Sequence, residues 1–552
     1  MKKGYSQEQE QELDVYVPTP LPESHILIEL YALLHDYPMI DADLTAAFLI
    51  GIDQGAARGQ PVFVQPPQEW DLQVWLQSQD AETQAFFGDA TTADVVWRVD
   101  GDIYGRRTAG AVYRQELETI LLEKMPLHGF QFVIGTKDPT HYRCVKSGVQ
   151  LLHHIDDFRS TGPGEALQRL FSTDLREYVE MRFSDLEIPG TMISSLGRNR
   201  LRTHEMIATI PDGKHAENII RITGCENAKP APVPSKPRSM REEDQVSLEP
   251  AMKQSYQEAT GSAIYLSLDH RTIQYAVKEL ARRMHDPQNA DWIAFKQLAR
   301  FLRNGDWPRV TIVTESEKAA YRSGKPLRCF AYTDSDWAGC PLTRRSSDNV
   351  VLGISTAVIS TSCQTQPGLP ATSSSDAEIR GMSRGAKDLI HLHQLASQDF
   401  NLKLDVPELY ADSSVGVTVS KKLGPGGKLK HLEVSHFYVQ AAQRTGLLKV
   451  KKVKGFVNPA NFLTKHPPSG HAVEEAMPSM GMLSLSEEYL KQQIANARHL
   501  KVAVLASSRT RETPAKEQSS SQPWKAPVLT AGNTLQIAAL ASLALGVKGE
   551  SQ

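Results

Sequence analysis

The stretch LRCFAYTDSDWAG, residues 327–339, decides the fold of the C-terminal half of the chain. It begins as a β-prone run and ends in Asp334 and Asp336, a pattern that predicts a buried strand with carboxylates at its end. The segment PELYADSSVGV, residues 407–417, repeats the pattern and ends at Asp412. We therefore expect an α/β region in which acidic side chains gather at strand ends.

A helix supplies a third acid. SSSDAEIRGMSRGAKDLIHL predicts a helix with Glu378 in its first turn. Each acid has another interpretation: Glu378 follows Ser375 with capping-box spacing, Asp412 suits a turn, and Asp336 suits an exposed surface. Together, Asp334, Glu378 and Asp412 can converge on a metal pair that hydrolyses phosphodiesters.

A second acidic set lies nearer the N-terminus. Asp43 stands in MIDADLTAAFL, and Asp156 and Asp157 stand in LLHHIDDF. The residues around the Asp-Asp pair predict a strand, a tight turn and a second strand. The pair could simply initiate the turn. With Asp43 it can instead bind two Mg²⁺ ions for phosphoryl transfer to a 3′-hydroxyl.

Composition limits the class of protein. The chain has 552 residues, which predicts two to four domains, and its net charge of −3 argues against a wholly basic nucleic-acid binder. Five scattered cysteines form no C-x-x-C pair. The N-terminus lacks a signal-peptide pattern, and the apolar tract at residues 535–547 is too short to span a bilayer. We expect a protein that is not secreted and has no membrane partner.

Periodicity predicts helices at two places. In residues 165–181, apolar positions recur on one face, and in residues 291–304 Asp291 is expected to cap a helix that buries Phe295, Leu298 and Leu302. Residues 227–245 are rich in proline and charge, so they predict a surface linker.

The ordered blocks resemble the Pol polyprotein of copia-type (Pseudoviridae-like) retrotransposons, across roughly residues 16–466. The reverse transcriptase part is matched by DLTAAF, VFVQPPQEW, IYGRRTAGAVY, HIDD and IYLSLDHRTIQYAVKELAR. The ribonuclease H part is matched by YTDSDWAG, TRRSS, SSSDAEI, ADSSVGV, KLKHLEVSHFYV and PANFLTKH.

The resemblance implies a multi-domain protein of α/β and α+β class. A reverse transcriptase palm with incomplete fingers is expected at 1–226, a linker at 227–250 and thumb or connection helices at 251–322. A ribonuclease H-like domain is expected at 323–468, and a mostly disordered tail at 469–552. The chain resembles the C-terminal part of the polyprotein.

The resemblance also assigns roles to residues. The expected catalytic and metal-binding acids are Asp43, Asp156, Asp157, Asp334, Glu378 and Asp412, with Asn461 in place of a further acid as a metal ligand. Nucleotide binding is expected at Phe48, where the family has its steric gate, and at Tyr104, Gly105 and Arg107. Nucleic-acid binding is expected at Lys428, Lys430 and His431, within a basic stretch that a solvated loop explains equally well.

The implied activities are RNA-directed DNA polymerase and ribonuclease H, each with two Mg²⁺ ions per site and Mn²⁺ as a substitute. The implied partners are an RNA template, a DNA primer, an RNA–DNA hybrid and dNTPs. The implied location is cytoplasmic, in a virus-like particle, or nuclear. The alternative is a degenerate, catalytically impaired relic that at most binds nucleic acid. His154 and Asn461, which replace the family's Tyr and Asp, favour this alternative.

Overall fold

The computed structural model describes residues 16–50, 62–99, 104, 106–195, 197–305, 307–424, 430 and 432–483. The chain divides into two compact units. One contains Met1–Tyr16, Ala47–Glu116 and Ala503–Gln552, and the other contains Val17–Ala46 and Leu117–Val502. The apolar tract at 535–547 and the predicted disordered tail beyond residue 483 lie outside the described residues.

The first unit contains a small two-stranded ribbon, β2 (Val62–Val64) with β3 (Trp97–Val99). Helices α3 (Leu72–Leu76) and α4 (Ala81–Phe87) lie between these strands in the chain, and Asp71 and Asp80 accept backbone hydrogen bonds at their N-termini. Side-chain oxygens at these positions satisfy amides that a helix start leaves unpaired. The start of α5 (Ala109–Thr119) also belongs to this unit.

The second unit begins with α1 (Pro22–His35), whose residues from Ile26 to Leu34 are all buried. A helix that is apolar on every side needs neighbours all round. Accordingly, α1 contacts the six-stranded sheet through β6 and β7, and it contacts β12 and β15 as well. This helix is therefore the centre on which the sheets of the unit pack.

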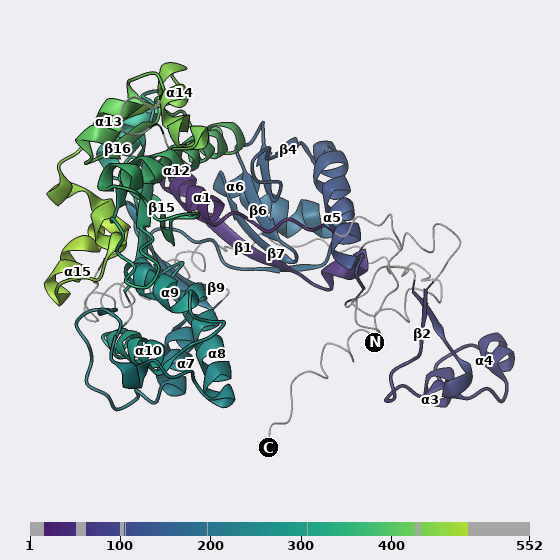
Figure 1. The fold of residues 1–552 in the computed structure, drawn as a ribbon. Coiled ribbons are helices and arrows are strands. Elements are labelled where there is room, and N and C mark those ends of the chain that lie inside the picture. The colour runs from purple at the N-terminus through teal and green to yellow at the C-terminus, as the bar shows by residue number, and fades with distance from the viewer. Residues whose placement is uncertain are drawn as a thin grey trace. The chain divides into compact units, whose positions relative to one another are not determined.

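The six-stranded sheet has the order β4-β5-β6-β7-β1-β8. Its bounds are β4 (Phe132–Ile134), β5 (His141–Cys144), β6 (Gln150–His154), β7 (Asp157–Thr161), β1 (Met39–Leu44) and β8 (Met181–Phe183). Figure 1 shows β1, β6 and β7 side by side with α6 (Gly164–Arg169) nearby. The predicted strand–turn–strand is confirmed: β6 and β7 pair antiparallel around Ile155, which has a φ of 55°.

The helix predicted over 165–181 forms in three short pieces. After α6 the chain widens into a π-helical turn, η6 (Leu170–Asp174), and then tightens into a 3-10 turn, η7 (Leu175–Glu177). Leu167, Leu170, Phe171, Leu175 and Val179 are buried, so the predicted apolar face is confirmed.

A four-stranded sheet, β12-β11-β10-β9, lies between the two acidic regions in the chain. Its bounds are β9 (Met192–Ser195), β10 (Arg198–Arg202), β11 (Met206–Ile210) and β12 (Arg309–Ile312). The helices that follow are α7 (Gly213–Ile222), α8 (Pro250–Leu266), α9 (Gln274–Ala281), α10 (Asn289–Leu302) and α11 (Glu315–Arg322). Because β11 pairs with β12, this sheet contains strands from both sides of the expected boundary at 226.

The proline-rich segment at 227–245 is packed rather than a free surface linker. Ala231 and Val233 are buried in the core that surrounds α8 and α10, and the Ala231 amide donates to the Arg300 carbonyl at 3.0 Å. Arg238 donates to Asp291 at 2.7 Å. Asp291 is not the cap of α10: Gln288 is, and Asp291 closes a capping box at the third helical position. The predicted burial of Phe295, Leu298 and Leu302 is confirmed.

The five-stranded sheet has the order β15-β14-β13-β16-β17. Its bounds are β13 (Cys329–Ser335), β14 (Ser347–Ile354), β15 (Ala357–Thr365), β16 (Glu408–Ala411) and β17 (Lys449–Lys452). β13–β15 are antiparallel, whereas β13, β16 and β17 are parallel. Helix α12 (Ser374–Gln394) packs on this sheet, and α13 (Ser414–Ser420) and α14 (Tyr438–Arg444) follow. The expected mixed α/β class is thus confirmed.

Order continues beyond residue 468. Helix α15 (Gly470–Ala476) is followed by η15 (Pro478–Met480), and Met477, Met480 and Met482 are buried in the core around α8 and α10. The predicted start of the disordered tail at residue 469 is therefore wrong. Local composition does not reveal that these methionines pack in the core around α8 and α10. In the part of the chain that the structure describes, no helix combines the length and apolarity needed to cross a membrane.

Candidate functional site

Three carboxylates meet at one edge of the five-stranded sheet. Asp334 lies near the end of β13, and Asp412 directly follows β16. These strands are parallel, with Thr333 opposite Ala411, so the two acids leave the sheet at the same edge. Helix α12 brings Glu378 to them, and one oxygen from each of the three residues lies within 4.8 Å of the others. The predicted convergence of these acids is present in the structure.

Two glycines let α12 approach the strand closely enough. A Cβ at position 381 would overlap the Ser335 side chain, and a Cβ at position 385 would overlap the Thr333 side chain. A side chain at either place would push the helix away from β13. Gly381 and Gly385 therefore set the distance between Glu378 and Asp334.

Burial and mutual repulsion make this cluster costly without a cation. Asp334 and Glu378 are only 7% and 8% exposed. Burial, and then the charges of Asp334 and Asp412, raise the pKa of Glu378 to about 9. Burial and the charge of Asp412 raise the pKa of Asp334 to about 6. Glu378 Oε2 is buried and has no hydrogen-bond partner among the described residues. An orphaned oxygen among three acids suits a divalent metal.

The segment around Asn461 supports the cluster from the other side. It forms η14 (Pro459–Thr464), and the Thr464 hydroxyl donates to Asp334 Oδ2 at 3.0 Å. The Asn458 side-chain amide donates to the Thr333 carbonyl at 3.0 Å. Asn461 is half-buried within the same turn. Thr464 and Asn458 were not predicted from sequence, because short hydroxyl and amide residues carry no local signal of such distant partners.

The capping interpretation of Glu378 is wrong. Helix α12 starts at Ser374, so Glu378 lies in its second turn rather than its first. Ser373 is the cap and accepts from the Asp376 amide, while Asp376 accepts from the Thr372 amide at 2.8 Å. Ser373 and Asp376 together satisfy the start of the helix, which leaves Glu378 available to the cluster.

Asp336 is not a simple surface acid. It is half-buried, and its Oδ1 accepts a hydrogen bond from the Ser347 amide on β14. Burial raises the pKa of Asp336. Its hydrogen bond indicates that it fixes the loop after β13, beside the cluster but outside the group of three.

The second acidic set lies on the six-stranded sheet. Asp43 on β1 is directly opposite Asp157 on β7, and the Leu44 amide donates to the Asp156 carbonyl at 2.9 Å. Burial and then Asp156 raise the pKa of Asp43, while burial, Asp156 and Asp43 raise the pKa of Asp157 to about 6. The three acids predicted to act together are therefore neighbours. Among the described residues, however, only Asp334, Glu378 and Asp412 meet the 4.8 Å spacing for a three-residue metal group.

A buried ion-pair network lies next to this second set. Asp41 is opposite Arg159, two positions along the same strands from the Asp43–Asp157 pair. Arg159 donates to Glu29 at 3.1 Å, and Arg309 donates to the same carboxylate at 3.0 Å. Glu29 is 2% exposed, and despite its burial the two arginines lower its pKa to about 2. The network joins α1, β7 and β12, and so fixes the strands that carry the acids.

The predicted nucleotide-binding residues belong to the other compact unit. Phe48 packs edge-on against Tyr104, with ring centres 4.7 Å apart, and Arg107 is exposed. Gly105 lies outside the described residues. Their relation to Asp43 therefore stays a prediction. Of the predicted nucleic-acid-binding residues, Lys430 is exposed, while Lys428 and His431 also lie outside the described residues.

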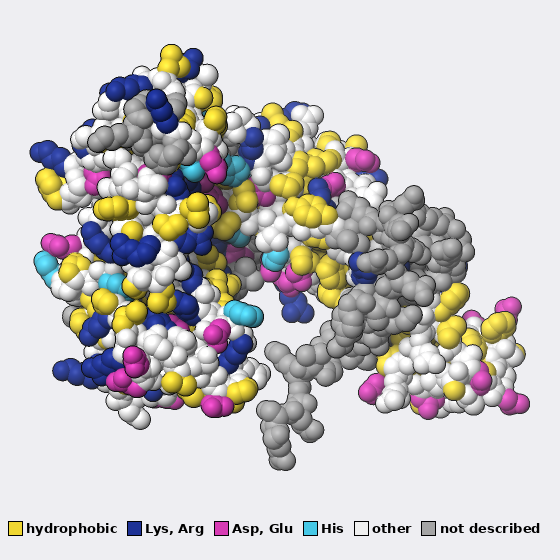
Figure 2. Space-filling view, in the orientation of Figure 1, with side chains coloured by type: hydrophobic (Ala, Val, Ile, Leu, Met, Phe, Trp, Pro, Cys, Tyr) yellow, Lys and Arg dark blue, Asp and Glu magenta, His cyan; other side chains and the backbone are white. Residues whose placement is uncertain are grey.

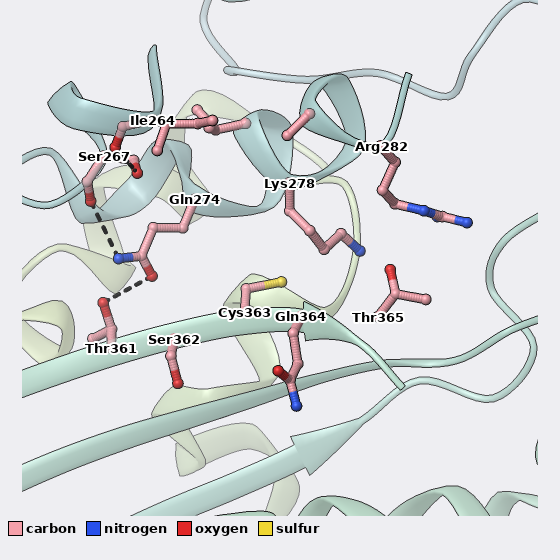
Figure 3. A pocket seen from close by; sticks show the side chains of 12 residues that line it. Ile264, Ser267, Gln274, Lys278, Arg282, Thr361, Ser362, Cys363, Gln364 and Thr365 are labelled. Carbon is pink, nitrogen blue, oxygen red and sulfur yellow. Dashed lines mark hydrogen bonds between the residues drawn. The ribbon is translucent and has the colours of Figure 1, made fainter. Parts of the chain in front are cut away.

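A hollow of about 520 Å³ lies between α9 and the edge strand β15. Figure 3 shows Gln274 bridging its two walls: its amide donates to the Ser267 carbonyl at 3.2 Å, and the Thr361 hydroxyl donates to its carbonyl oxygen at 2.9 Å. Lys278 and Arg282 also line it, but both form ion pairs with Glu279. The ion pairs offset the positive charge in the hollow. We therefore interpret the hollow as a packing contact between α9 and β15 and not as a ligand site.

One further acid was missed by sequence reasoning. Asp399 lies in η10 (Leu395–Asp399), which continues α12, and its carboxylate accepts from the backbone amides of residues 136, 137 and 138 at 2.8–2.9 Å. These amides belong to the loop between β4 and β5. Asp399 thus fastens the six-stranded sheet to α12.

No protein-family model matches the chain. It is 24% identical over 475 residues to the retrovirus-related Pol polyprotein from transposon RE2 of Arabidopsis thaliana, covering 84% of this chain and 29% of that protein. It is 25% identical over 388 residues to the equivalent protein from transposon TNT 1-94 of Nicotiana tabacum, covering 68% of this chain and 27% of that protein.

A shorter relative and two solved structures are also similar. The uncharacterized mitochondrial protein AtMg00810 of A. thaliana is 29% identical over 250 residues, or 45% of this chain and 96% of that protein. The N-terminal RNase H domain of Rv2228c from Mycobacterium tuberculosis is 19% identical over 28% of this chain and 98% of that chain (TM-score 0.19). A foamy viral protease-reverse transcriptase in complex with RNA/DNA hybrid is 10% identical over 79% of this chain and 67% of that chain (TM-score 0.24).

The described residues form a mixed α/β fold in which acids gather at the strand ends of two sheets. The chain is a relative of the retrovirus-related Pol polyproteins of copia-type transposons, which confirms the resemblance seen in the sequence blocks. It spans less than a third of the length of those polyproteins.

Proposed function

We propose that the chain hydrolyses the RNA strand of an RNA–DNA hybrid at Asp334, Glu378 and Asp412. The observation that carries the proposal is the approach of these carboxylates within 4.8 Å, with one buried Glu378 oxygen left without a described hydrogen-bond partner. Bound cations remove the repulsion between the three carboxylates. The cations then present positive charge to the phosphate group that is to be hydrolysed.

The residues present fit Mg²⁺, which prefers oxygen ligands. Asp334, Glu378 and Asp412 would hold the ions, and Asn461 can add a neutral amide oxygen. A bound pair of Mg²⁺ ions, or Mn²⁺ in their place, supplies an activated water and stabilises the leaving oxygen. The chain's own residues prepare this site: Thr464 orients Asp334, the paired strands fix Asp334 and Asp412, and α12 fixes Glu378.

The test is cleavage of an end-labelled RNA–DNA hybrid in Mg²⁺. Asp334→Asn and Glu378→Gln should each reduce the rate at least about a hundredfold, because each removes a charged ligand while keeping the side-chain shape. Asp336→Asn is the matched control, since an amide oxygen can still accept from Ser347. Cleavage that persists in Asp334→Asn, or an unmodified protein that does not cut, would overturn the proposal.

A second activity is RNA-directed DNA synthesis at Asp43, Asp156 and Asp157, with an RNA template, a DNA primer and dNTPs. It is supported by the position of Asp43 opposite Asp157 and by the raised pKa of both acids. Primer extension with Mg²⁺ tests it. Asp156→Asn should abolish extension, whereas Glu165→Gln, an exposed acid on α6, should leave it unchanged. Equal extension by unmodified protein and Asp156→Asn would contradict this assignment.

The alternative to both activities is a relic that binds nucleic acid without turnover. Asn461 and His154 favour it, because each replaces a group that the family carries at that place. Tight hybrid binding by unmodified protein, with neither cleavage nor extension in Mg²⁺ or Mn²⁺, would support the relic.

A further inference from the structure

An exposed aromatic ring stands on a short loop beside the three-carboxylate cluster. The loop, residues 453–457, connects β17 to the turn that contains Asn461 and includes η13 (Gly455–Val457). Phe456 is 83% exposed and Val457 is 55% exposed. An isolated exposed apolar residue is ordinary on a protein surface, so a function for Phe456 depends on where its ring lies.

Both ends of the 453–457 loop are hydrogen-bonded to residues next to the acids. At its start, the Val453 amide donates to the Ala411 carbonyl at 3.0 Å, one residue before Asp412. Just after its end, Asn458 donates to the carbonyl of Thr333, one residue before Asp334. In between, a Cβ on Gly455 would lie 2.9 Å from Asp412 Oδ2. Two hydrogen bonds therefore hold the loop against the cluster, and between them its backbone passes close to Asp412.

Cations accompany the ring. Lys454 lies over Phe456, with its Nζ 5.8 Å from the ring centre, and Lys452 donates to the Asp412 carbonyl. On β17, the exposed Lys449 and Lys452 continue this charge along the edge of the five-stranded sheet, whereas Lys451 pairs with Glu408. Figure 2 shows Lys and Arg side chains on the part of the molecule that Figure 1 labels α13, α14 and β16. A polyanion would find complementary charge along this edge.

We propose that the 453–457 loop is a nucleic-acid contact, in which Phe456 packs on a base or sugar of the strand entering the acid cluster and Lys454 pairs with its phosphate. Aromatic rings bind bases regardless of sequence, and lysines bind phosphates in a salt-dependent way. The loop thereby adds a subsite next to the bond that is cut. The proposal rests on the proposed ribonuclease function for the identity of that bond.

The test is equilibrium binding of a fluorescein-labelled RNA–DNA hybrid to the full chain in EDTA, where no cleavage occurs, between about 50 and 200 mM salt. Phe456→Ala should raise the Kd about tenfold with an unchanged salt slope. Phe456→Tyr should restore affinity. Lys454→Gln should reduce the slope of log K against log salt by about 0.7–0.9, the loss of one phosphate contact. Phe86→Ala is the matched control, because Phe86 is also 83% exposed.

The outcomes separate the two proposals. If the unmodified chain binds and the Phe456 and Lys454 variants bind equally well with the same slope, the subsite is overturned. If the unmodified chain binds no nucleic acid, both the subsite and the ribonuclease function are overturned. If binding depends on Phe456 and Lys454 but the hybrid is never cut in Mg²⁺, the subsite stands and the ribonuclease proposal alone fails.

Discussion

The Thr464 hydroxyl donates a hydrogen bond to Oδ2 of Asp334 at 3.0 Å, across 130 positions of the sequence. Both groups are buried, so water does not readily replace the bond if it is lost. Because the hydroxyl favours the ionised carboxylate, it holds the pKa of Asp334 below the value that burial and Asp412 alone would give. The protonation state of the metal cluster thus depends on a residue outside it.

Thr464→Val is expected to move the acid limb of hybrid cleavage to higher pH. The pKa of Asp334 is already raised to about 6, and removal of the hydroxyl donor raises it further, so more of the protein is protonated near neutral pH. We expect a shift of about 0.5–1 pH unit at limiting Mg²⁺. Thr464→Ser should restore the original profile. A uniform loss of rate at every pH would instead indicate a packing defect.

Glu378→Gln is expected to stabilise the metal-free protein at alkaline pH. The pKa of Glu378 rises from 4.5 to about 9 on folding, so its contribution to stability is fully present below 4.5 and is lost as pH rises through 9. Glutamine does not ionise and avoids this loss. In EDTA at pH 8.5 we expect a Tm higher by about 2–4 °C, with little difference at pH 5. Thermal unfolding at both pH values checks this, and equal Tm values at pH 8.5 would contradict it.

The same variant should respond less to magnesium. A cation that binds only the folded state raises its stability, and the gain depends on affinity. Added Mg²⁺ should therefore raise the Tm of the unmodified protein more than that of Glu378→Gln. An equal response would place the stabilising ion away from this cluster.

Glu29→Gln is expected to be strongly destabilising. It leaves Arg159 and Arg309 buried with a neutral partner, and breaking a buried pair in this way costs about 3–5 kcal/mol. Urea unfolding at pH 7 measures the loss, and Glu217→Gln, an exposed acid on α7, is the control. The pKa of Glu29 is lowered to about 2, so its contribution is present above pH 4.5 and is lost as pH falls through 2. Glutamine lacks this contribution at every pH, so the difference in stability between the unmodified protein and the variant should shrink as pH falls toward 2.

Asp399→Ala is expected to loosen the loop between β4 and β5. The carboxylate satisfies three backbone amides at once, and hydrogen bonds to a charged group are worth about 1.5–3 kcal/mol each. Hydrogen exchange at residues 136–138 should accelerate markedly, while amides of α8 should exchange as before. Unchanged protection at these three amides would show that the carboxylate is not their main partner.

Sequence predicted the acid cluster well because strand ends and helix starts have local signals. Asp334 and Asp412 stand at strand ends, and the parallel pairing of β13 with β16 brings them to one edge, while Glu378 lies in the second turn of α12. The packed segment at 227–245 was misjudged, because its proline-rich composition resembles a linker and its partners at Arg300 and Asp291 lie about 50–70 positions away. The four-stranded sheet was missed for the same reason, since β12 joins β9–β11 from a distant part of the chain.

The two glycines of α12 make the cluster of Asp334, Glu378 and Asp412 easy to lose. Most single-base changes in a glycine codon's first two letters introduce a side chain, and at Gly381 or Gly385 any side chain would meet β13. A gene copy that drifts without selection can therefore lose the geometry of the cluster at either glycine while its three acids remain. Both are intact in this chain, so surveying these two positions among related genomic copies offers a way to tell maintained copies from decaying ones.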